Sequence, residues 1–356
     1  MPDELPVSLR PGCPGGSDSS GPRHPLRSDR ADGPGGPNGP SLRYPRHSAA
    51  CPRRPLRVGV QLPEVEREVR WPELRDMARR AEDAGLDSLW VGDHVLYRFA
   101  DRSVRGPWEA WTQLAALAAV TSQVWLGPLV SATAFRNPLL LAKQAATLDE
   151  ISTGRLVLGL GAGWNPVEFA AMGLPFDHRV ARFDEAFAII RALLREGSVD
   201  FVGQYHQARE AELVPRGPSA GGPPLMIGSI GPHMLATTAR DMDAWNAWYA
   251  DTGNTPAGAV AAAAGLDRAL AAVGRVPDEV ARTVAVLVQL PGGTGRTMGD
   301  TSDAQHVVPL TGAPEEIAAG LCAYADAGFT EVQVVLDPIT ADAIDSLRPA
   351  LAALDA

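Results

Sequence analysis

Three short segments hold the residues of this chain that are best suited to chemistry. They are Asp93-His94, the glycine-rich turn 159–164 and the segment Gly228–Gly231, and each follows an apolar run. An imidazole can donate or accept a proton near neutral pH because its ordinary pKa is about 6.5. Glycine carries no Cβ, so a ligand can approach the main chain closely at the other two segments.

The two glycine-rich segments each have a binding interpretation and a plainer one. Gly228–Gly231 leads into a predicted helix, whose free N–H groups and dipole attract an anion, and the Ser229 hydroxyl adds a donor. The plainer alternative is a simple N-cap of that helix at Ser229 or nearby. Likewise, 159–164 is either a ligand-binding loop or a tight strand-to-helix turn. Tryptophans near strand ends suit either a flat aromatic ligand or packing at the rim. They are Trp90, Trp108, Trp164, Trp245 and Trp248.

Other common catalytic arrangements do not occur in the sequence. Asp93 adjoins His94 on a strand-like backbone and therefore points to the opposite side, so the pair does not begin a metal site. There is no Ser-His-acid pattern and no CxxC motif. We therefore predict no metal, and the sparse cysteines fit a reducing cytoplasm.

The elements that must position these residues alternate between strands and helices from residue 57 onward. The predicted strands are 57–62, 87–94, 124–130, 155–160, 224–228, 244–248, 283–290 and 331–336. The predicted helices are 71–85, 108–120, 138–150, 176–197, 232–240, 256–273, 315–328 and 340–354. A hairpin is expected at 199–207, and 291–310 forms a long loop, either a functional lid or a disordered insertion. Such an α/β pattern predicts a (β/α)8 barrel, whose active site lies at the carboxyl ends of the strands.

Residues 1–55 have a composition unlike the rest of the chain. Gly, Pro, Ser and Arg dominate there, so the segment cannot bury enough apolar surface to fold, and we predict a disordered extension. Either an incorrectly assigned start or a flexible segment without function explains it. Residues 56–356 then form one barrel domain.

The net charge of −10 argues against a nucleic-acid partner, because no basic stripe is available to neutralise phosphates. No apolar run reaches the roughly 18 residues that span a bilayer. We expect a soluble cytoplasmic protein that acts on a small molecule.

Five blocks of sequence resemble one family, in order along the chain. They are SLWVGDHV (88–95), residues 134–176, RFDEAFAIIRAL (182–193), residues 221–248 and residues 311–336. The chain is similar to the luciferase-like monooxygenase superfamily, and within it resembles the branch that uses the deazaflavin coenzyme F420. The resemblance implies a TIM barrel of the bacterial-luciferase type and an oxidoreductase that moves a hydride between C5 of F420 and an organic substrate, as a homodimer. The alternatives are an FMN-dependent monooxygenase that uses oxygen and a cofactor-binding relative without turnover.

The resemblance also implies site residues. His94, with Asp93, corresponds to a histidine that faces the reactive carbon of the cofactor and exchanges a proton as the hydride moves. A structural histidine bonded to a neighbouring loop is the alternative. Leu129 and Val130 correspond to a bulge with a non-prolyl cis peptide that backs the cofactor ring, and Ser131 and Thr133 would donate to the polar edge of that ring. The remaining implied cofactor contacts are Gln61, Ala162, Gly163, Trp164, Gly228, Ser229 and Gly231, the last six at the ribityl chain and phosphate.

Two departures from the sugar-phosphate dehydrogenases of this branch bear on the substrate. Those enzymes carry a glutamate where this chain has Trp164, and an aromatic residue where it has Arg98. The differences leave the cofactor seat intact but remove the basis for a sugar-phosphate substrate. Arg98, Arg102 and Arg105 either meet an anionic substrate or form a solvated loop face.

Overall fold

The computed structural model describes residues 43–45, 47–296 and 307–356, and Leu42–Ala356 form one compact unit. Its main sheet has nine strands in the order β5-β2-β1-β13-β12-β11-β10-β7-β6, and every neighbouring pair is parallel. The strands are β1 (Arg57–Gln61), β2 (Ser88–Val91), β5 (Trp125–Pro128), β6 (Ser131–Ala132), β7 (Leu158–Gly161), β10 (Leu225–Gly228), β11 (Ala244–Ala247), β12 (Ala281–Gln289) and β13 (Glu331–Asp337).

The sheet closes on itself between its third and fourth predicted strands. β5 and β6 are two halves of one strand, interrupted at residues 129–130, and β6 pairs with β7. A parallel bridge between Leu126 and Leu156 joins β5 to the same neighbour. Counting β5 and β6 as one strand gives eight, so the predicted (β/α)8 barrel is confirmed. Most strand positions are buried, as expected for parallel strands covered on both faces.

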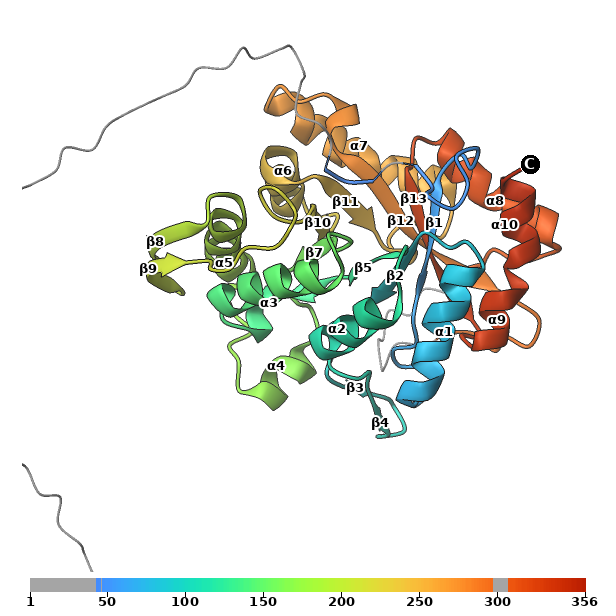
Figure 1. Cartoon of the computed structure of the whole chain (residues 1–356), viewed down its shortest axis with the longest axis horizontal. Helices are drawn as coiled ribbons and strands as arrows, with labels where there is room; N and C mark the ends of the chain where they lie inside the picture. The colour runs from blue at the N-terminus through green and yellow to red at the C-terminus, as the bar shows by residue number, and fades with distance from the viewer. Residues whose placement is uncertain (1–42, 46, 297–306) are drawn as a thin grey trace, which may run out of the picture. The chain divides into compact units, whose positions relative to one another are not determined.

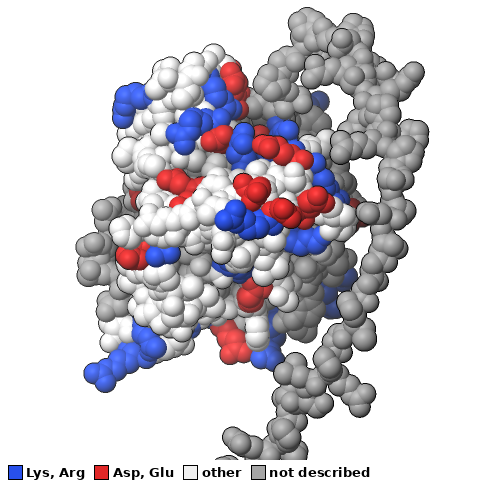
Figure 2. All heavy atoms as spheres, turned by 90° about the vertical axis from the view of Figure 1, so that its left-hand side faces the viewer, with Lys and Arg blue, Asp and Glu red and all other residues white. Residues whose placement is uncertain are grey.

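Helices surround the barrel (Figure 1). They are α1 (Trp71–Asp83), α2 (Ala110–Val120), α3 (Pro138–Ile151), α4 (Pro166–Met172), α5 (Arg179–Arg195), α6 (Pro232–Asp241), α7 (Pro256–Ala272), α8 (Pro314–Asp326), α9 (Ala341–Ser346) and α10 (Arg348–Leu354). Within the described ranges, none of them combines the length and the hydrophobicity that a bilayer crossing needs. On the face drawn in Figure 2, acidic and basic side chains are interspersed.

The sequence-based prediction missed three small elements and merged two others. It did not predict α4 or the antiparallel pair β3 (Tyr97–Arg98) and β4 (Val104–Arg105), whereas the expected hairpin is present as β8 (Ser198–Val202) and β9 (Gln207–Glu212). The predicted helix 340–354 is α9 followed by α10, because Pro349 has no N–H to continue the first helix.

The amino-terminal boundary of the barrel lies earlier than predicted. Residues 1–42 and 46 of the predicted extension lie outside the described residues, but the segment that follows packs onto the barrel. Tyr44 is 1% exposed and donates a hydrogen bond from its hydroxyl to Glu331. Arg54 forms ion pairs with Asp87 and Asp355. Residues 297–306 of the expected loop also lie outside the described residues, and Leu310 bridges to β12.

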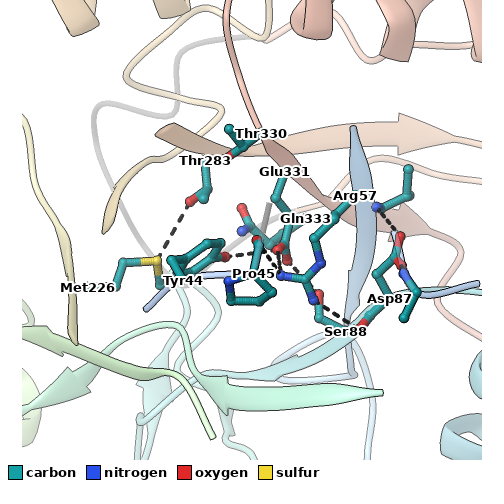
Figure 3. A network of polar contacts seen from close by, with 12 residues as sticks. Tyr44, Pro45, Arg57, Asp87, Ser88, Met226, Thr283, Thr330, Glu331 and Gln333 are labelled. Carbon is teal, nitrogen blue, oxygen red and sulfur yellow. Dashed lines mark hydrogen bonds and ion pairs between the residues drawn. The ribbon is translucent and has the colours of Figure 1, made fainter. Parts of the chain in front are cut away.

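A buried ion pair fills the amino-terminal end of the barrel (Figure 3). Arg57 Nη1 lies 2.7 Å from Glu331 Oε2, and both side chains are at most 1% exposed. Glu331 also accepts hydrogen bonds from Ser88 and Tyr44, and the guanidinium lies over the Tyr44 ring. The cost of burying these charges is offset by mutual pairing and by satisfied hydrogen bonds.

We expect Glu331→Gln to lower the free energy of unfolding by about 3–5 kcal/mol, because it leaves the Arg57 charge buried without its counter-charge. Urea denaturation measures the change. Glu68→Gln is the matched control, since the pair of Glu68 with Arg70 is about three-quarters exposed on both sides and contributes under about 1 kcal/mol. Equal effects of the two substitutions would contradict this account of the barrel interior.

Candidate active site

A buried carboxylate holds His94 at the carboxyl end of β2. His94 Nδ1 lies 2.8 Å from Oε2 of Glu168, whose side chain is fully buried. The other oxygen of Glu168 accepts the backbone N–H groups of Val95, at 2.6 Å, and Leu96, at 3.3 Å. Glu168 belongs to α4, which starts at Pro166 behind an Asn165 side-chain cap. The same carboxylate therefore fixes both the imidazole and the chain that follows it.

A second carboxylate faces the other ring nitrogen. Glu64 Oε1 lies 3.7 Å from His94 Nε2 and accepts a 2.7 Å hydrogen bond from the Tyr97 hydroxyl. Gln61 Nε2 donates to Oε2 of Glu64, also at 2.7 Å. Gly92 makes room for this carboxylate, because a Cβ there would stand 2.4 Å from Glu64 Oε1. The Nε2 atom of His94 is thus close to Glu64 but beyond hydrogen-bond distance.

These charges control the protonation of His94. Burial lowers the pKa of the imidazole, but the hydrogen bond to Glu168 and the negative charges of Glu64, Glu168 and Asp93 outweigh burial, so the pKa lies above its ordinary value. Burial and the neighbouring Glu64 charge also raise the pKa of Tyr97, which stays a hydrogen-bond donor. The arrangement favours an imidazolium that can deliver a proton from Nε2.

Arg296, in the loop after β12, completes the cluster. Its side chain is 1% exposed, its Nη2 lies 3.3 Å from Glu64 Oε2, and its Nε bonds Glu66. The guanidinium also lies 5.5 Å from the centre of the Trp248 ring. Asp337, at the end of β13, accepts backbone N–H groups from the loop that carries Arg296. Burial lowers the pKa of Arg296, but the charges of Glu66, Tyr249 and Glu64 outweigh it and raise the pKa.

Asp93, predicted to be catalytic with His94, lies in a different cluster. Arg136 binds both of its oxygens, at 2.6 and 2.8 Å. Ser131 Oγ and Ala132 N donate to the same carboxylate. Asp93 therefore anchors β6, and its negative charge also raises the pKa of His94. The Ser131 hydroxyl donates to Asp93, and the Thr133 hydroxyl donates to the Gly161 carbonyl. Both hydroxyls therefore already have protein partners.

The interruption between β5 and β6 contains the expected bulge. The Leu129–Val130 peptide bond is cis, as the resemblance implied. The Val130 side chain lies against three glycines: added Cβ atoms would stand 3.0 Å away from it at Gly159, 2.8 Å at Gly161 and 3.0 Å at Gly228. These glycines therefore accommodate Val130 itself, while Leu129 and Val130 stay half-buried at the open end of the barrel.

The two predicted ligand turns differ in how open they are. Gly163 has φ of +80°, and a Cβ there would meet the Phe169 ring at 2.9 Å, so this glycine serves packing. Ala162 beside it is half-buried, and Trp164 is 49% exposed and lies edge-on to His94, with ring centres 5.5 Å apart.

The segment Gly228–Gly231 has an open approach. A Cβ at Gly231 would meet only the Ser229 hydroxyl, at 3.6 Å. That hydroxyl accepts the Gly231 N–H at 3.2 Å, and the N-cap of α6 is Gly231, without a side-chain cap. The plainer alternative, a simple cap at or near Ser229, stays open, because α6 is capped two residues further on, at Gly231. A cavity of about 560 Å³ adjoins the start of α6 and includes His233 in its wall.

Sequence reasoning missed Glu64, Glu168, Tyr97 and Arg296. Each follows the end of a predicted strand, which was the available signal. The sequence places Trp164 where related enzymes carry a glutamate, and it is Glu168, four residues further along, that reaches His94. Among the described residues, no group of three or more His, Cys, Asp or Glu side chains forms a metal-binding cluster.

We expect Glu168→Gln to lower the pKa of His94, because the amide keeps the geometry but removes the charge that stabilises the imidazolium. An NMR titration of the His94 ring measures this shift. Glu185→Gln is the matched control, since Glu185 likewise accepts backbone N–H groups but from residues 204–206. An unchanged His94 pKa in Glu168→Gln would refute the role given to this carboxylate.

Known proteins match this chain over most of the barrel. The model of the family described as luciferase-like monooxygenase matches residues 56–291. An F420-dependent glucose-6-phosphate dehydrogenase of Kineococcus radiotolerans is 28% identical over 333 residues, covering 78% of this chain and 93% of that protein. The enzyme of the same name from Amycolatopsis mediterranei is 35% identical over 185 residues, which are 48% of this chain and 55% of the relative.

A solved structure agrees with the barrel described above. An F420-dependent secondary alcohol dehydrogenase, in complex with an F420-acetone adduct, superposes with a TM-score of 0.71 at 19% identity, covering 84% of this chain and 99% of that one. This likeness shows the shared fold, a barrel of the bacterial-luciferase type. With the family match over residues 56–291, it leads to one conclusion: the chain belongs to the luciferase-like monooxygenase family.

Proposed function

We propose that this protein is an F420-dependent oxidoreductase that moves a hydride between C5 of the deazaflavin and an organic substrate. The observation that carries the proposal is the placement of His94 just after β2, with Nδ1 bound to Glu168 and Nε2 3.7 Å from Glu64, beyond hydrogen-bond distance. The relatives named as F420-dependent support the choice of cofactor.

Features of the barrel's open end fit such a cofactor. The apolar surface of Leu129 and Val130 is half-buried and offers a wall for a flat ring. The uncapped start of α6 offers free N–H groups for a phosphate, and Gly231 leaves the backbone accessible. Ala162, Trp164 and Ser229 lie along the turns between these two features. We assign the ring, the ribityl chain and the phosphate to these residues.

Protein side chains would manage the proton that accompanies the hydride. When bound, F420 supplies or accepts the hydride. Glu168 keeps a proton on Nδ1 of His94, so the exchangeable proton is the one on Nε2. Nε2 delivers this proton to the substrate oxygen during reduction and removes it during oxidation. Glu64 stabilises the charged ring in both directions. We also propose a cytoplasmic homodimer, and a monomer by light scattering would contradict the dimer.

We expect the full chain to bind F420 more tightly than FMN. A titration of each cofactor, read by tryptophan fluorescence, tests the expectation because Trp164 is half-exposed beside the site. Preference for FMN would instead favour the alternative, a monooxygenase that uses reduced flavin and oxygen.

We expect His94→Ala to keep F420 affinity and to lose about 100- to 10,000-fold in turnover, the usual contribution of a general acid or base. Turnover is followed by F420 absorbance with alcohols, aldehydes and sugar phosphates as candidate substrates. His206→Ala, in the β8–β9 hairpin, is the control and should behave like the unmodified protein. Full activity of His94→Ala would favour the reading of His94 as a structural residue.

A further inference from the structure

We propose, on the basis of the function proposed above, that the substrate of this site is an uncharged alcohol or carbonyl compound with an apolar body. The sequence left open whether arginines near His94 receive an anion. Charge and contacts around His94 point to the neutral class.

Three carboxylates and one guanidinium, that of Arg296, lie around His94, so acidic groups are in excess there. Glu168 and Glu64 lie 2.8 and 3.7 Å from its two ring nitrogens. Glu66 adds a third carboxylate next to Glu64. One oxygen of Glu66 accepts the backbone N–H groups of Glu64 and Val65, which holds the side chain in place. A phosphate or carboxylate of a substrate beside Nε2 would be repelled by these groups, which are shielded from water and therefore interact strongly.

The cation within the cluster is already paired. The Arg296 side chain, 1% exposed, is bound by Glu64 and Glu66. Arg136 is similarly paired with Asp93 and Glu109. The only lysine of the chain, Lys143, belongs to α3 and donates to a backbone carbonyl. The two arginines therefore balance carboxylates of the protein itself, and Lys143 is bound to the main chain.

The three arginines after β2 are all exposed. Tyr97 is buried and reaches Glu64, so Arg98, its neighbour on β3, is on the opposite face and exposed. Arg105 stacks on Phe99 and donates to the Glu66 carbonyl. Arg102 lies exposed in the turn between β3 and β4. This arrangement favours the second of the two alternatives, in which these arginines form a solvated face of the loop.

Aromatic and apolar surfaces surround the cluster. Trp164 and Tyr97 both lie against the His94 ring, with ring centres 5.5 and 4.7 Å away. Trp248 stacks near Tyr249 on the Arg296 side, with ring centres 4.6 Å apart. Such walls suit an apolar substrate body, and a single polar atom, the reacting oxygen, meets Nε2.

The proposed reaction balances with these groups. In oxidation, the C–H bond of an alcohol breaks and its hydride passes to C5 of F420, while the O–H proton passes to Nε2 of His94. The substrate loses two electrons and becomes a carbonyl compound, and the cofactor gains them. Reduction of a carbonyl compound is the reverse.

The test uses the full chain with F420 and two substrate classes at matched concentrations. The neutral class is 2-propanol, cyclohexanol and 1-phenylethanol, the anionic compound is glucose 6-phosphate, and glucose separates the effect of charge from that of the sugar. We expect kcat/KM for the best neutral alcohol to exceed that for glucose 6-phosphate by about 100-fold or more. A preference for glucose 6-phosphate would overturn the inference.

If turnover is too slow to measure with either substrate class, a binding measurement tests the same inference. The F420-loaded chain is titrated with cyclohexanone and with glucose 6-phosphate, and tryptophan fluorescence reports occupancy. Cyclohexanone binding with weak glucose 6-phosphate binding supports the inference. Tighter binding of glucose 6-phosphate, or no binding of cyclohexanone, overturns it. In either of those cases, binding of F420 would leave the proposed function standing. Failure to bind F420 at all would overturn the proposed function first. Trp164→Ala should raise KM for 1-phenylethanol more than for 2-propanol, since only the larger alcohol loses an aromatic contact.

Discussion

The carboxylate of Glu168 is the contact on which the candidate site depends. It is fully buried, and its two oxygens bind the imidazole of His94 and the two backbone N–H groups that follow. A buried carboxylate is stable only when its oxygens are satisfied, so α4 and the chain after β2 hold each other in place. Figure 1 shows α4 and the β3–β4 hairpin on the same side of the barrel. Removing this carboxylate would release the ring and its local backbone together.

The two ends of the barrel use buried charge for different purposes. At the amino-terminal end, Arg57 and Glu331 are paired within a closed hydrogen-bonded network that also includes Tyr44. At the carboxyl-terminal end, His94 lies between two carboxylates and keeps one nitrogen without a close partner in the cluster. The first arrangement stabilises the fold, whereas the second leaves a proton available for chemistry.

The strands and long helices could be predicted because their apolar residues repeat with the period of each element. His94 could be found because it ends a strand at the catalytic rim. Glu64 and Glu168 could not, since their contacts with His94 depend on how two loops fold across the rim. The partner of Asp93 could not be foreseen, because Arg136 is remote from it in sequence. Tyr44 was missed because one aromatic residue in a polar segment carries no periodic signal, although its burial places the barrel boundary before residue 56.

The most direct test of the account is a crystal structure of the full chain with F420 bound. The account predicts that C5 of the deazaflavin lies above Leu129 and Val130 and that His94 Nε2 faces it, at a separation one substrate oxygen can bridge. The Glu168 contact to Nδ1 should be retained. A cofactor ring bound away from His94, or a His94 ring turned so that Nε2 points into the protein, would contradict the proposed proton transfer.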